Sequence, residues 1–252
     1  MTILESLLRW THVVAGIIWI GHLYFFNWVN GPFQGTLDGP TKKAVNPQLL
    51  PRALYWFRWG AAWTWVTGVL LVLLVFYHGG IMFDDGGAWG PATFILLAIT
   101  FLAFLGYDQL FKTDLGKDLK KATPVVYAIV AIIVLCMQFI AHWGYRAVAI
   151  HVGTMFGTIM AANVWMRIWP AQRKIILAVR EGQPPDATLV ALAGARSRHN
   201  TYMSVPLVWM MLNTHTTWAA GGMGWLVTLV MIALGWATVA QLYKKAGTVP
   251  GF

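Results

Sequence analysis

The sequence predicts an all-α integral membrane protein, a polytopic bundle of about seven transmembrane helices. Hydrophobic residues make up 58% of the 252 residues, and charged residues make up only 11%. A water-soluble chain of this length could not hide that much apolar surface in its core, so lipid must cover the remainder. The 15 Trp include many near the ends of apolar segments, which is typical of side chains at the level of the lipid headgroups.

Seven segments approach the roughly 20 apolar residues that a helix needs to cross a bilayer. In chain order they are Leu7 to Val29, Trp59 to Tyr77, Pro91 to Tyr107, Pro124 to Trp143, Ala147 to Trp169, Tyr202 to Trp218 and Trp225 to Tyr243. The third and sixth segments are short, and Pro206 predicts a kink in the sixth. We expect the first segment to be retained as a helix, because no basic residue precedes it and no small-residue cleavage site follows it.

Two polar stretches separate some of these segments. Residues 170–200 combine an amphipathic helix over 172–180, a break rich in Gly and Pro, and a second short helix over 187–195. This pattern predicts a cytoplasmic interfacial loop, and residues 30–51 are similar. We therefore expect residues 1–252 to form a single integral membrane domain.

The cationic residues predict the orientation of the chain. If the loops alternate in side, 16 of the 18 Lys and Arg residues collect on one side, namely Lys42, Lys43, Arg52, Arg58, Lys112, Lys117, Lys120, Lys121, Arg167, Arg173, Lys174, Arg180, Arg196, Arg198, Lys244 and Lys245. Only Arg9 and Arg146 fall on the other side. The positive-inside rule then places the N-terminus outside and the C-terminus in the cytoplasm. The net charge of +9 is explained by loops that face anionic lipid, and nothing in the sequence suggests a nucleic-acid partner.

Six of the seven histidines lie inside or at the ends of apolar segments. Histidine is costly in hydrocarbon, so an intramembrane histidine is a candidate for metal or haem binding. His12 and His22 share the first segment, and both fall on one helical stripe with Trp19, so both imidazoles can face the bundle interior. The candidate cofactor ligands are His12, His22, His142, His151, His199 and His215.

Depth narrows the candidate pairs, because the two axial ligands of a haem come from facing helices at equal depth. With a rise of about 1.5 Å per residue, His12 lies in the outer half of the membrane and His22 lies deeper. On the outer side His12 can pair with His151, His142 or His215, and His151 matches its depth best. On the inner side His22 can pair with His199. The predicted ligands of haem iron are therefore His12 with His151, and His22 with His199.

Each histidine also has a purely structural interpretation. His12, His22 and His151 could each be satisfied by an interhelical hydrogen bond. His142 could bind water and headgroups at the interface, and His199 lies in a basic interfacial run. His78 is expected at the surface. Met211 lies near His215 in the sequence, and its sulfur could bind copper. Copper is therefore a less favoured alternative to haem b as the cofactor.

Cys136 is the only cysteine, and it lies within the fourth apolar segment, where a thiol is typical of packing. The sequence therefore contains neither a disulfide framework nor a Cys-x-x-Cys-His site for c-type haem. Any haem must be held by side-chain ligation alone, as one or two b-type haems.

Three segments resemble the N-terminal membrane domain of bacterial membrane-bound urate hydroxylases. They are residues 11–27 (THVVAGIIWIGHLYFFN), 198–206 (RHNTYMSVP) and 211–215 (MLNTH). The pattern His-x-x-Ala-Gly-x-x-Trp-x-Gly in the first is shared with copper-resistance and haem-biosynthesis membrane proteins. The pattern running from His199-Asn200 through Pro206 to Asn213-x-His215 is more specific.

The resemblance implies oxidation of urate to 5-hydroxyisourate, with electrons passed to a cytochrome c domain fused at the C-terminus. This sequence departs from that pattern, because it ends at Phe252 without a Cys-x-x-Cys-His motif. We therefore expect a separate cytochrome c, or another redox protein, as the partner. The polar residues Asn213 and Thr214 are candidate catalytic groups for a purine, with an ordinary polar helix end as the alternative.

The predicted protein is thus a multi-pass haem oxidoreductase of the bacterial inner membrane. Two alternatives remain open. One is a non-catalytic electron-transfer or assembly subunit of a larger membrane complex. The other is a copper or small-solute membrane protein that binds no macrocycle.

The predicted orientation can be tested by cysteine labelling from the periplasmic side. Asp84→Cys should react with a membrane-impermeant maleimide, whereas Lys117→Cys should react only after the membrane is permeabilised, because the positive-inside rule places Lys117 in the cytoplasm. The reverse labelling pattern would overturn the orientation.

Overall fold

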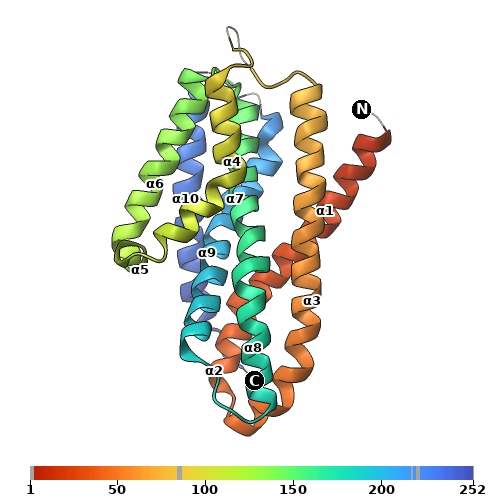
Figure 1. The fold of residues 1–252 in the computed structure, drawn as a ribbon, viewed down its shortest axis with the longest axis vertical. Coiled ribbons are helices and arrows are strands. Elements are labelled where there is room, and N and C mark those ends of the chain that lie inside the picture. The colour runs from red at the N-terminus through yellow and green to blue at the C-terminus, as the bar shows by residue number, and fades with distance from the viewer. Residues whose placement is uncertain (1–2, 84–86, 217, 220–221, 252) are drawn as a thin grey trace. The chain divides into compact units, whose positions relative to one another are not determined.

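The computed structural model is helical through nearly all of the chain that it describes, which comprises residues 3–83, 87–216, 218–219 and 222–251 (Figure 1). The elements are α1 (Ile3–Tyr24), η1 (Phe25–Asn30), α2 (Gly31–Thr36), α3 (Gly39–Leu71), η2 (Val72–His78), α4 (Pro91–Leu110), α5 (Asp114–Lys117), α6 (Leu119–Leu135), η3 (Cys136–Ile140), α7 (Tyr145–Asn163), η4 (Val164–Ile168), α8 (Trp169–Arg180), α9 (Ala187–Leu212), η5 (Asn213–His215) and α10 (Gly224–Ala246). Asp84, the labelling position, and the side chain of His215 lie outside the described part of the chain.

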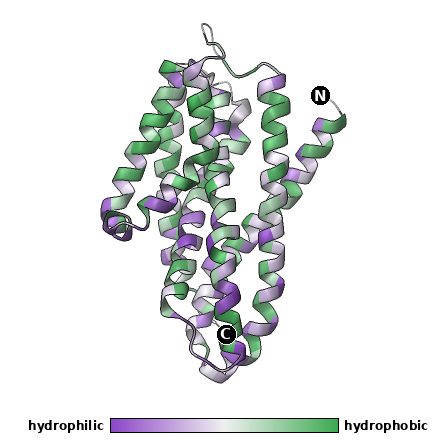
Figure 2. Ribbon diagram, viewed as in Figure 1, coloured by the Kyte–Doolittle hydropathy of each residue, from purple (hydrophilic) through white to green (hydrophobic). Residues whose placement is uncertain are grey.

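Six helical segments of the described residues are long and apolar enough to cross a membrane. They are Ile3–Thr36, Gly39–His78, Pro91–Leu110, Leu119–Ile140, Tyr145–Arg180 and Gly224–Ala246. Hydrophobic residues follow each other along much of these helices (Figure 2). The prediction of an all-α chain with several long apolar helices is therefore confirmed, and these helices are consistent with a multi-pass membrane protein. The predicted sixth segment, within α9, is not among the six, so the count of seven and the orientation stay predictions.

Both polar stretches are more helical than the hydropathy pattern predicts. Residues 39–51 form the beginning of α3, and the short helix expected over 187–195 is continuous with the rest of α9. Side-chain caps explain where α3 and α9 begin. The Asp38 carboxylate accepts a hydrogen bond from Thr41 N at 2.8 Å, and Asp186 accepts one from Thr188 N at 2.8 Å. These hydrogen bonds also hold the pKa of both carboxyl groups below their usual range.

Four of the long helices contain a short π-helical segment, in which the turn is wider than in an α-helix. These segments are η1, η2, η3 and η4. π-helical turns are rare in proteins as a whole, but those that occur are often found at functional sites. Each such turn redirects the side chains that follow it. Two of them, η1 and η4, contribute residues to the cavity described below.

The chain divides into two compact units. The first contains residues within 1–68, 160–205 and 236–252, and the second contains residues within 69–159 and 206–235. In the first unit α1 crosses α3 closely, because a Cβ atom on Gly60 would lie 3.0 Å from the backbone nitrogen of Trp19 (Figure 1). Trp19, Leu23 and Phe57 are buried around this crossing.

The second unit packs α7 and α10 against the C-terminal part of α9. A Cβ atom on Gly153 of α7 would lie 3.1 Å from the Met211 side chain, and one on Gly235 of α10 would lie 2.8 Å from Pro206 Cδ. The glycines of α7 thus serve close helix packing. The prediction of a single membrane domain stays a prediction.

Candidate functional site

His12 is held against α3 by hydrogen bonding to Thr67 and to the backbone of Thr64. Its Nδ1 lies 3.1 Å from Thr67 Oγ1, and this hydroxyl donates its own proton to a backbone carbonyl, Trp63 O, at 2.6 Å. Because the hydroxyl has only one proton, it must accept from His12. His12 is therefore protonated on Nδ1, and its Nε2 keeps an unprotonated lone pair, which is the form that binds a metal ion.

Gly68 explains how the His12 ring can lie so near α3. A Cβ atom at this position would lie 2.9 Å from His12 Cε1, which is too close for any other residue unless the imidazole shifts. Thr67 and Gly68 are thus a positioning pair for His12. The sequence analysis missed them, although a Thr-Gly pair inside an apolar span is a signal of close approach.

His22 has the same tautomer by a different contact. Its Nδ1 donates to the Ile18 carbonyl one turn earlier in α1, at 2.7 Å. The His22 ring is half-buried, and its centroid lies 6.5 Å from that of Phe26. Nε2 of His22 forms no hydrogen bond within the described part of the chain. Its lone pair is therefore available to a ligand.

His151 differs from these two, because both of its nitrogens are satisfied. Nδ1 donates to the Ala147 carbonyl at 2.7 Å, so Nε2 must accept the hydrogen bond from Tyr77 Oη at 2.9 Å. The side chain is 0% exposed, and the Trp143 ring lies against it with the two centroids 4.6 Å apart. His151 thus has the interhelical hydrogen bond of the structural interpretation, and Tyr77 would have to release Nε2 before a metal could bind there.

The remaining histidines lie in varied settings. His78 and His142 are exposed, and His142 has a left-handed backbone with φ of 50°. His199 is half-buried beside Arg196, which is itself 3% exposed. His215 belongs to η5. The sequence analysis did not anticipate a buried Arg196, because the position was assigned to an interfacial loop.

The predicted ligand pairs are distributed unequally over the two units. His12, His22 and His199 belong to the first unit, whereas His151 belongs to the second. The pairing of His12 with His151 therefore stays a prediction, as does that of His22 with His199. Within the described residues no group of three or more His, Cys, Asp or Glu side chains could hold a metal ion. A haem needs only one or two axial ligands from the protein.

The candidate catalytic residues Asn213 and Thr214 belong to η5, directly after α9. Asn213 Nδ2 donates to the Trp209 carbonyl at 3.2 Å, and Thr216 Oγ1 donates to the Asn213 carbonyl at 2.7 Å. Thr214 is buried. These bonds satisfy carbonyl groups that a helix end leaves unpaired, which is the role expected of an ordinary polar helix end. A catalytic role for Asn213 and Thr214 stays a prediction.

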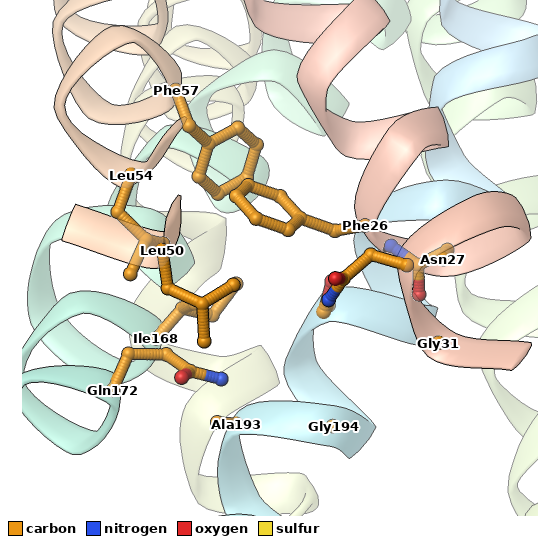
Figure 3. Close-up of a pocket in the computed structure, with 12 residues that line it drawn as sticks. Phe26, Asn27, Gly31, Leu50, Leu54, Phe57, Ile168, Gln172, Ala193 and Gly194 are labelled. Carbon is orange, nitrogen blue, oxygen red and sulfur yellow. Dashed lines mark hydrogen bonds between the residues drawn. The ribbon is translucent and has the colours of Figure 1, made fainter. Parts of the chain in front are cut away.

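A cavity of about 240 Å³ lies within the first unit (Figure 3). Its walls combine apolar and polar residues from six elements, namely Phe26, Asn27, Asn30, Gly31, Leu50, Leu54, Phe57, Ile168, Gln172, Ala193, Gly194 and Ser197. The sequence analysis missed this cavity, because its residues come from segments far apart in the chain. The only signal was the presence of amide side chains at the borders of apolar segments.

These features define a helical protein with several long apolar helices, three histidines that each bond through Nδ1, and a cavity lined by apolar and amide side chains. Residues 33–249 match a family model described as urate oxidase N-terminal. The match covers most of the chain, which therefore belongs to the urate oxidase N-terminal family. No curated protein and no solved structure matches the chain. The resemblance predicted from the sequence is confirmed, and two of its three segments lie inside the matched range.

The hydrogen bond between Tyr77 and His151 can be tested by Tyr77→Phe. This change leaves Nε2 of a fully buried imidazole without a donor, which should cost about 1–3 kcal/mol of unfolding free energy. The midpoint of thermal unfolding in detergent should fall by several degrees. Tyr55→Phe is the matched control, since Tyr55 is 47% exposed and its hydroxyl forms no hydrogen bond within the described residues. Equal midpoints for the two variants would contradict the assigned contact.

Proposed function

We propose that this protein is a b-type haem oxidoreductase of the bacterial inner membrane, which oxidises urate to 5-hydroxyisourate and passes the electrons to a cytochrome c. The observation that carries the proposal is the family match over residues 33–249. The membrane helices and the deep histidines support it, because helical bundles with histidines on facing helices hold b-type haem.

The histidines of α1 fit the axial-ligand role. A ligating histidine usually donates its second ring nitrogen to a protein acceptor, which sets the tautomer and makes the ligand more basic. His12 and His22 both have that arrangement, through Thr67 and through the Ile18 carbonyl. When bound, haem b would accept one electron at a time. His151 would fit this role only after Tyr77 has moved.

The reaction balances with water as the source of oxygen. Urate and one water give 5-hydroxyisourate, two protons and two electrons. A c-type cytochrome accepts one electron, so two equivalents are reduced for each urate. These 252 residues contain no Cys-x-x-Cys-His motif, so the c-type haem must belong to another segment or another protein.

A second candidate function is that of a non-catalytic subunit in a larger membrane complex. The observation that favours it is the exposed apolar face near the start of α1, formed by Ile3, Leu4, Leu7 and Trp10. Lipid or another subunit would cover this face.

The proposed activity can be tested by adding urate anaerobically to the oxidised, purified protein. The haem absorbance should change to that of the reduced form in proportion to urate, and steady turnover should require added cytochrome c or an artificial acceptor. A spectrum that urate leaves unchanged, while a quinol reduces the haem, would refute the urate reaction and favour the electron-transfer subunit.

Alanine variants test whether the predicted histidines hold the haem that this reaction requires. His12→Ala and His151→Ala should each lose the low-spin haem signal, because an axial ligand is removed. His78→Ala should keep it, since His78 is exposed. Full retention of the signal in both of the first two variants would exclude the pairing of His12 with His151.

A further inference from the structure

We infer that the cavity of the first unit is the binding site for a planar purine, with the carboxamide of Gln172 and the amide nitrogen of Asn30 as its recognition groups. The inference rests on the proposed function, for which the purine is urate. Nothing in the sequence pattern or in the family match assigns a ligand to this cavity. Its shape, its unused hydrogen-bonding groups and its distance from His22 carry the assignment.

The walls of the cavity suit a small flat ring system. The rings of Phe26 and Phe57 meet edge to face, with their centroids 5.4 Å apart, and Leu50 and Leu54 continue the apolar wall. In the view of Figure 3 the Phe26 and Phe57 rings lie above Leu50, and the Gln172 carboxamide lies below it. Ligand sites of small molecules are typically apolar hollows with a few placed polar groups. A cavity of about 240 Å³ has room for a bicyclic heterocycle and excludes a macrocycle.

The polar groups of the cavity fall into two classes. Asn27 is fully engaged, since Nδ2 donates to Leu23 O at 2.9 Å and to Ser197 Oγ at 2.8 Å, while Oδ1 accepts from Tyr243 Oη at 2.8 Å. This network holds η1, α9 and α10 together. Asn27 and Ser197 are therefore positioning residues.

The side chains of Gln172 and Asn30 have polar atoms that form no hydrogen bond within the described residues. The Gln172 carboxamide points into the cavity and forms no hydrogen bond within the described residues (Figure 3). Asn30 uses only its oxygen, which accepts from Gln34 at 3.3 Å, and its Nδ2 donates no hydrogen bond there. A carboxamide presents a donor beside an acceptor, and each edge of urate also pairs N–H with C=O. One carboxamide can thus form two parallel hydrogen bonds with one purine edge.

Urate carries one negative charge at neutral pH. Two arginines adjoin lining residues in the sequence, since Arg196 directly precedes Ser197 and the exposed Arg173 follows Gln172, but neither is itself a lining residue of the cavity.

The cavity also lies next to a candidate haem ligand. Phe26 lines the cavity and its ring centroid is 6.5 Å from that of His22, in the same helical segment. A purine in the cavity would therefore lie one aromatic ring away from His22. The lining residues border the polar stretches that the predicted orientation assigns to the cytoplasm.

The site can be tested by filling it. No heavy atom lies within 4 Å of a Cβ atom built on Gly194, a lining residue of α9, so Gly194→Leu should occupy the cavity without displacing other groups. Gly106→Leu is the matched control, because Gly106 is also an exposed helical glycine with open space around its Cβ position, in the second unit. Binding of urate to the purified protein is measured by equilibrium dialysis. We expect Gly194→Leu to weaken binding at least tenfold and Gly106→Leu to bind as the wild type does.

Recognition by the carboxamide is tested with Gln172→Leu and Gln172→Glu. Loss of two hydrogen bonds to an anion should weaken urate binding about tenfold or more in Gln172→Leu. Gln172→Glu should be weaker still, because a carboxylate repels the anion. Unchanged haem absorbance and thermal midpoint show that the variants are folded.

The outcomes separate this inference from the proposed function. If the wild type binds urate and the Gly194 and Gln172 variants bind it equally well, the purine site lies elsewhere and only this inference is overturned. If binding depends on both residues but urate does not reduce the haem, the site stands and the proposed reaction falls. A wild type that binds no urate overturns both.

Discussion

The structure depends on one constraint, which is that an imidazole buried among apolar helices needs a partner for its N–H. Three deep histidines meet this need in the same way, by donating from Nδ1 to an acceptor inside the protein, either Thr67 Oγ1 or a backbone carbonyl one turn earlier. The consequence is that Nε2 carries the lone pair in each ring. The group in contact with Nε2 then determines whether that histidine can bind a ligand. His151 meets Tyr77, whereas His12 and His22 keep Nε2 available.

In the first unit, α1 and α3 pack closely because small residues make room for these histidine rings and for the helix backbones. Gly68 leaves room for His12, and Gly60 lets α1 approach α3 at Trp19. Beyond this crossing the wider turn of η1 directs Phe26, Asn27 and Asn30 toward the cavity. The same two helical segments, α1 with η1 and α3, therefore pack closely at their crossing and line the cavity beyond it.

Much of the fold was predictable, because hydropathy alone identifies long apolar segments. The predicted bounds of α4 and α10 agree with the structure to within a few residues. The predicted start of α3 was wrong, since Asp38 begins that helix in polar sequence that a hydropathy pattern assigns to a loop. The helix predicted from Ala187 does begin there, but it continues through the whole of α9 instead of ending at Ala195. The candidate site was predictable only in part. A histidine at depth is visible in the sequence, but its tautomer depends on Thr67, 55 positions away, and the cavity joins Asn30 to Gln172 through tertiary packing.

The central claim is that the available Nε2 atoms of the α1 histidines ligate haem iron. The most direct measurement is the reduced-minus-oxidised absorbance spectrum of the protein purified from its own membrane, together with its iron and copper content. We expect a Soret band, the sharp α band of a low-spin b-type haem, and at least one iron per chain. Copper or no metal, with no Soret band, would contradict the claim.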